Sequence, residues 1–135
     1  MRAAAGKFEL TEVRRLILAM LELGQEEEVL SFLNRSMEER LDWKNRPAIL
    51  QLRGRALLQL ANRSFLSARS KRSRSGRPLG RALDECRRYL AEAEHDLRAA
   101  LAQGPDPVVL DHIRISLDSV QTLKSLAEKP RAKPR

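Results

Sequence analysis

The sequence predicts an all-α protein of about five antiparallel helices, built as a helical bundle or a short stack of helical hairpins. Leu, Ala, Arg and Glu, which favour helix, dominate the 135 residues, and the β-branched residues are few. Apolar side chains recur at three- and four-residue spacing along five segments. We expect a single domain over residues 10–127, with an N-terminal arm at 1–9 and a tail at 128–135.

The first two helices should form an antiparallel hairpin. The first is expected over residues 10–23, and Gly24 follows as a residue able to take a left-handed conformation. Glu26, Glu27 and Glu28 open the second helix, where carboxylates suit the positive end of the helix dipole. The apolar residues of the second helix are Val29, Leu30, Leu33, Met37 and Leu41.

The third helix should start at Pro47 and run to about Phe65 or Leu66. Its apolar side chains cover roughly 240° of arc, far more than a surface helix needs. Ile49, Leu52, Ala56 and Leu60 form one flank, and Leu50, Leu57, Ala61 and Phe65 form the other. This helix is therefore expected between two neighbours, with Gly54 allowing one of them a close approach.

Arg53 lies inside the apolar arc of the third helix, and its position has two interpretations. It can snorkel to the surface or pair with a carboxylate from the second or fourth helix. Alternatively, its guanidinium can be held towards a phosphate of a ligand.

Residues 67–78 are rich in Ser and Arg and have no apolar side chain larger than alanine, which predicts a flexible basic loop. The fourth helix should begin near Pro78 or Leu79 and end at Gly104. Asp106 is a good N-cap for a fifth helix that begins at Pro107. From residue 128 the chain should form a disordered basic tail.

The most unusual feature is a basic block without carboxylates. The 41 residues from Trp43 to Leu83 contain no Asp or Glu and eleven basic residues, nine Arg and two Lys. Of the chain's 26 basic residues 15 lie outside this block, where they face all 18 acidic ones, so the block alone makes the net charge +8. Such a concentration of positive charge is typical of a protein that binds a polyanion, although charge that only aids solubility is the alternative.

We therefore expect a non-catalytic subunit of a larger nucleoprotein assembly that binds nucleic acid, RNA or a single strand. Arginine predominates over lysine, as suits bidentate phosphate contacts. No base-reading motif is visible, so binding should be largely independent of sequence. The expected contacts are Lys44, Arg46, Arg53, Arg55, Arg63, Arg69, Lys71, Arg72, Arg74, Arg77 and Arg81, with Lys129, Arg131, Lys133 and Arg135 of the tail.

The exit of the fourth helix resembles a tetratricopeptide repeat. Ala93, Leu97, Ala100 and Pro105 follow the order of small, large, small and proline that ends such a repeat. Leu23-Gly24, with Val29 and Leu33, is similar to the turn and second helix of a preceding unit. The resemblance spans about residues 10–127 and implies a groove for protein partners without enzymatic activity. It supports the alternative function, a protein-interaction adaptor whose basic loop contacts an acidic partner.

The sequence shows no sign of catalysis, cofactor binding or a membrane span. His95 and His112 are far apart, Cys86 is the only cysteine, and no phosphate-binding glycine loop is present. The carboxylates Glu26–Glu28 and Glu92, Glu94 and Asp96 are interpreted as solvated helix faces or partners of helix dipoles. The longest apolar run has six residues, too few to cross a membrane. We expect no enzyme, metal or cofactor, no small-molecule substrate, and a reducing, cytoplasmic location.

Overall fold

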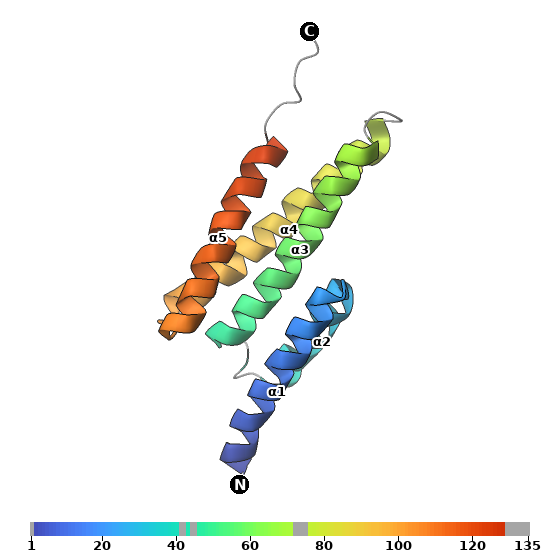
Figure 1. The fold of residues 1–135 in the computed structure, drawn as a ribbon. Coiled ribbons are helices and arrows are strands. Elements are labelled where there is room, and N and C mark those ends of the chain that lie inside the picture. Colours follow the sequence, from blue (N-terminus) through green and yellow to red (C-terminus); the bar gives the residue numbers. More distant parts are fainter. Residues whose placement is uncertain (1, 41–42, 44–45, 72–75, 129–135) are drawn as a thin grey trace.

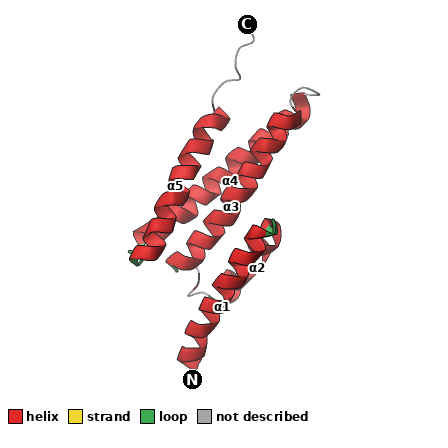
Figure 2. Ribbon diagram, viewed as in Figure 1, coloured by secondary structure: helices red, strands yellow, loops and turns green. Residues whose placement is uncertain are grey.

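The computed structural model describes the backbone of residues 2–40, 43, 46–71 and 76–128, and the side chains of residues 11–40, 43, 46–69 and 81–127. This part of the chain is all-helical, as predicted, and contains no strand (Figures 1 and 2). Its helices are α1 (Arg2–Glu22), α2 (Glu26–Glu39), α3 (Pro47–Lys71), α4 (Gly76–Ala102) and α5 (Pro107–Glu128).

Consecutive helices run antiparallel, so α3 and α5 run parallel to each other, with α4 between them and running the opposite way (Figure 1). The turn from α1 to α2 is a Schellman motif: Gly24 has a φ of 78°, Gly24 N–H donates to the Leu21 carbonyl at 3.1 Å, and Gln25 N–H donates to Met20 at 3.0 Å. The side chain of Asp106 accepts the Val109 N–H at 3.0 Å, which confirms it as the N-cap of α5.

Helix α3 is the central helix, as its two apolar flanks predict. It contacts α1, α2, α4 and α5. Ile49, Leu52 and Ala56 belong to a core shared with α1 and α2, which also contains Trp43. Leu50, Leu57, Ala61 and Phe65 belong to a second core shared with α4 and α5. Helix α3 therefore lies between two hydrophobic cores and contributes one flank to each of them.

Gly54 allows the close approach that the sequence predicts. A Cβ atom at this position would lie 2.8 Å from Cγ of Leu97, a fully buried side chain of α4. The crossing of α3 and α4 at Gly54 is therefore tighter than any residue with a side chain permits without movement.

Two predicted boundaries are wrong, and both err towards too little helix. The expected arm at 1–9 is helical from Arg2, because Ala, Lys and Glu in this segment favour helix. Helix also enters the expected loop at 67–78 from both sides, since α3 ends at Lys71 and α4 begins at Gly76, and residues 72–75 of that loop lie outside the described residues. Arg and Lys also favour helix, Ala68 is buried, and Pro78 stands in the first turn of α4, where proline is tolerated.

Candidate functional site

The predicted phosphate contacts divide into residues with structural partners and residues without them, and Arg53 belongs to the first group. Its Nε donates to Oδ1 of Asn34 on α2 at 2.9 Å, and its Nη1 donates to Oδ2 of Asp96 on α4 at 2.5 Å. The guanidinium also lies 3.9 Å from Glu92. Of the two interpretations of Arg53, the structure shows the structural one, an arginine that joins α2 and α4 across α3.

Asp96 is buried, with a side chain only 5 % exposed, contrary to its interpretation as part of a solvated face. Burial raises the pKa of Asp96, while the charge of Arg53 and its hydrogen bond act in the opposite direction. Burial is the larger effect because the carboxylate loses most of its contact with water, and Arg53 restores only part of that solvation.

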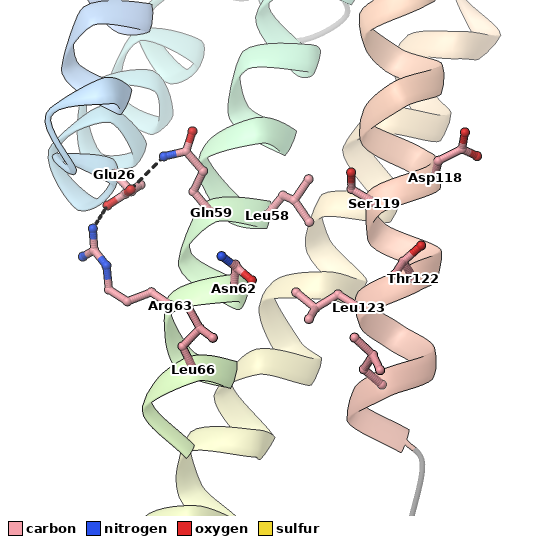
Figure 3. A pocket seen from close by; sticks show the side chains of 11 residues that line it. Glu26, Leu58, Gln59, Asn62, Arg63, Leu66, Asp118, Ser119, Thr122 and Leu123 are labelled. Carbon is pink, nitrogen blue, oxygen red and sulfur yellow. Dashed lines mark hydrogen bonds and ion pairs between the residues drawn. The ribbon is translucent and has the colours of Figure 1, made fainter. Parts of the chain in front are cut away.

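Arg63 also has a structural role, at the turn between α1 and α2. Its Nη2 donates to Oε1 of Glu26 at 2.5 Å and to the carbonyl of Gly24 at 3.1 Å. Gln59, one helical turn earlier, donates to Oε2 of Glu26 at 2.8 Å (Figure 3) and to the carbonyl of Leu21 at 3.1 Å. Glu26 is therefore a buried carboxylate that connects this turn to α3. Of its two interpretations, a solvated residue or a partner of the helix dipole, its burial contradicts the first, and its place in the first turn of α2 fits the second.

Several other predicted contacts gather where α3 ends and α4 begins, which we call the basic end. Arg69 is exposed and lies over the ring of Phe65, 5.8 Å from its centroid, and Arg81 is exposed on α4. Lys71 and Arg77 occupy the helical turns nearest the four-residue connection. No carboxylate belongs to either of these chain segments, because the acid-free block extends to Leu83.

The remaining predicted contacts lie elsewhere. Arg46 is exposed, precedes α3 and has an interaction partner. Arg55 is half-buried on the side of α3 that faces α5. The predicted contacts outside the described residues are Lys44, Arg72, Arg74, Lys129, Arg131, Lys133 and Arg135.

A groove of about 730 Å³ lies between α3 and α5, at a place that no residue pattern in the sequence indicates (Figure 3). Leu58 and Leu66 of α3 and Leu123 and Leu126 of α5 supply its apolar surface. Leu66 is 54 % exposed and Leu126 is 45 % exposed. The one sequence feature that could have indicated this groove is the wide apolar arc of α3, because an arc of that width can contact a third helix in addition to the two expected neighbours.

The polar residues along this groove are Gln59, Asn62, Arg63, Asp118, Ser119 and Thr122, with Glu26 at its border. Three of these side chains are already hydrogen-bonded, because Gln59 and Arg63 both donate to the carboxylate of Glu26 (Figure 3). The groove is therefore an amphipathic surface whose free polar groups lie mainly on α5.

A second polar cluster joins α4 to α5 and centres on Glu94. Its carboxylate accepts hydrogen bonds from Arg98 at 2.9 Å and from Lys124 at 3.2 Å. These two bonds lower the pKa of Glu94 below its ordinary value. The cluster is a structural ion-pair network, in which a single carboxylate, Glu94, is held by two cationic side chains.

Among the described residues, no group of three or more His, Cys, Asp or Glu side chains is placed to hold a metal ion. Cys86 is fully buried in the core of α3, α4 and α5, and burial raises the pKa of its thiol. In the same part of the chain, none of the helices combines the length and apolar character that a membrane crossing requires.

The sequence matches no protein-family model, and no curated protein or solved structure shows significant similarity to it.

Proposed function

We propose that the protein binds the sugar–phosphate backbone of a nucleic acid, RNA or a single strand, through the basic end, as a non-catalytic subunit of a larger assembly. The observation that carries this proposal is the convergence of Arg69, Lys71, Arg77 and Arg81 at one end of a helical hairpin whose segments contain no carboxylate. Arg53 and Arg63 leave the set of expected contacts, because their guanidinium groups hold the fold together.

Binding at the basic end should be independent of base sequence. Phe65 is the only aromatic residue beside these cations in the described side chains, and it is buried, with Arg69 lying over its ring. It therefore offers no platform on which bases could stack. Affinity should come from neutralised phosphates and fall steeply with salt.

The experiment is a salt titration of binding to a fluorescein-labelled single-stranded RNA, followed by fluorescence anisotropy. Four phosphate contacts predict a slope of log K against log salt of about −2.8, since each contact on a single strand contributes about −0.7. The variant Arg69→Gln/Arg81→Gln should flatten this slope by about 1.4. Arg35→Gln, an exposed position on α2 outside the basic block, is the matched control and should keep the wild-type slope. Absence of binding at low salt, or a double variant with the wild-type slope, contradicts the proposal.

A second candidate function is supported by the groove between α3 and α5. The two helices run parallel with α4 between them, so a helix antiparallel to both would complete a four-helix arrangement (Figure 1). The exposed Leu66 and Leu126 would then be covered by the apolar face of that helix. In the groove itself Arg63 is paired with Glu26 and Asp118 adds a carboxylate, so the attraction for charge lies at the end beside Leu66. We propose that the helix carries acidic residues at that end, because Arg69 follows Leu66 by about one turn of α3 and α3 contains no carboxylate. This is the adaptor function that the tetratricopeptide-like pattern implies.

The adaptor proposal is tested with two labelled amphipathic peptides that share one leucine stripe and carry either Glu or Lys on the opposite face. The Glu peptide should bind, and Leu66→Asp or Leu126→Asp should abolish its binding. Leu16→Asp, at a similarly exposed apolar position on α1, is the control and should not affect binding. Equal binding of both peptides, or equal loss in the control, argues against an acidic helix in this groove.

A further inference from the structure

A small recess between α3 and α5, next to the groove, has the composition of an anion site. Its volume is about 250 Å³, several times a water molecule's share of liquid volume. Gln51, Arg55, Leu58 and Gln59 line it from α3, and His112, Ile115, Ser116 and Ser119 line it from α5. These positions repeat at three- and four-residue spacing, so each helix contributes one continuous face. None of the lining residues is acidic.

Arg55 is the unusual residue of this recess. It is half-buried, yet it makes no ion pair or hydrogen bond with any residue that the structure describes. Arg53, two residues earlier and directed to another side of α3, has partners on two helices. Fully buried guanidinium groups are almost always paired, because desolvation of the charge is costly, and Arg55 has lost much of its contact with solvent without gaining a partner. The missing partner of Arg55 is therefore expected to be a ligand.

Two polar side chains beside Arg55 are more than nine-tenths buried, Gln51 at 3 % exposure and Ser116 at 7 %. Within the described part of the chain, Gln51 has no hydrogen-bond partner. Ser119 adds a hydroxyl, and His112 adds an imidazole N–H. Gln59 is not available, because its amide already donates to Glu26 and to the Leu21 carbonyl.

We propose that this recess binds one phosphate group, with Arg55 as the charged contact and Gln51, Ser116, Ser119 and His112 as hydrogen-bond donors. A guanidinium excludes cations and binds the oxygens of a phosphate bidentately. The several acceptor oxygens of a phosphate match the number of donor groups better than the two oxygens of a carboxylate do. Arg55 and Arg69 are fourteen residues apart on α3, about 21 Å along the axis, so this site is separate from the basic end and does not depend on it.

The first test is titration of the full chain with inorganic phosphate at constant ionic strength, followed by ¹⁵N–¹H NMR of Ser116 and of the Gln51 side-chain amide. Arg55→Gln should weaken phosphate binding by about tenfold or more, as expected for loss of a charge-assisted bidentate contact. Arg35→Gln removes the same charge at an exposed position on α2, outside both proposed sites, and should leave the affinity unchanged. Ser116→Ala, which keeps the fold and the charge, should weaken binding by a few-fold and serves as the test if Arg55→Gln does not fold.

The second test distinguishes the source of the phosphate. Two RNA oligonucleotides of one sequence are compared, one with a 5′-phosphate and one with a 5′-hydroxyl. A stronger affinity for the phosphorylated end that disappears in Arg55→Gln identifies a nucleic-acid end as the ligand. Equal affinities, together with retained binding of inorganic phosphate, identify free phosphate or a small phosphate ester. Absence of NMR shifts with phosphate at concentrations of order 10 mM, or equal shifts in wild type and Arg55→Gln, overturns the proposal.

Discussion

Replacing Gly54 by alanine tests whether the crossing of α3 and α4 has the tightness that the structure shows. The new Cβ would lie 2.8 Å from Cγ and 2.9 Å from Cδ2 of Leu97, and 3.5 Å from the carbonyl oxygen of Ala93. Carbon atoms in contact are ordinarily about 3.5–4.0 Å apart, so the overlap approaches an ångström. Leu97 is fully buried and cannot move into solvent. The helices must therefore separate or the side chain must leave its rotamer.

The magnitude follows from two opposing effects. Overpacking a dense core costs about 1–3 kcal/mol, and alanine in place of glycine inside a helix contributes about 1 kcal/mol of stability. Because the overlap is large and Leu97 is enclosed, we expect Gly54→Ala to lower the free energy of unfolding by about 1–2 kcal/mol. Leu97→Ala should cost about 2–5 kcal/mol through its cavity. In that background Gly54→Ala no longer overlaps Leu97 and should stabilise the protein by about 1 kcal/mol.

The assay is urea unfolding of the wild type, both single variants and the double variant, followed by circular dichroism at 222 nm and by the fluorescence of Trp43. The expected coupling free energy between the two positions is about 2–3 kcal/mol, in the direction that makes the double variant more stable than the sum of the singles. Additivity within about 0.5 kcal/mol would refute the reasoning, because it would show that Gly54 and Leu97 are not in contact.

Three further predictions address the buried polar groups and the cysteine. Asp96→Ala should lower the free energy of unfolding by about 3 kcal/mol, because it leaves the partly buried Arg53 without its main partner. Glu92→Ala, at the exposed end of the same cluster, should lower it by less than about 1 kcal/mol. Urea unfolding of both variants measures these differences. Because hydrogen bonds from Arg98 and Lys124 lower the pKa of Glu94 in the folded state, its contribution to stability should be present above its ordinary value of 4.5 and be lost as pH falls through the folded-state pKa. The stability difference between wild type and Glu94→Gln should therefore shrink between pH 6 and pH 3, and a difference that does not change with pH would contradict this. Cys86 should react with a thiol reagent such as DTNB only as fast as the protein unfolds, because it is fully buried and burial raises the pKa of its thiol; a native rate equal to that in urea would be inconsistent with the core position.

Most of the helical architecture could be predicted because its signals are local. The N-cap at Asp106, the left-handed Gly24 and the start of α3 at Pro47 each depend on residues within one turn of the boundary. The division of α3 into two flanks also follows from spacing alone, and the two cores match it. The boundaries near residues 9 and 67 were missed because arginine, lysine and serine are compatible with helix as well as with loop.

The sequence did not indicate which residues form the candidate sites. Arg53, Arg55 and Arg63 are equivalent members of a basic block in the sequence, but each faces a different neighbour in the fold. Arg53 contacts Asp96, 43 residues away, and Arg63 contacts Glu26, 37 residues away in the other direction. Arg55 faces the carboxylate-free recess. No local pattern distinguishes these three environments, because each is made by helices distant in sequence.

The basic block that makes the net charge +8, the five apolar stripes and the small residue at position 54 are properties of the chain that the sequence states directly. Which arginines in that block remain available to a ligand depends on the packing of α2, α4 and α5 around α3. The physical reason is that net charge is a sum over residues, whereas the partner of a charge depends on which helix faces it across a distance of a few ångströms.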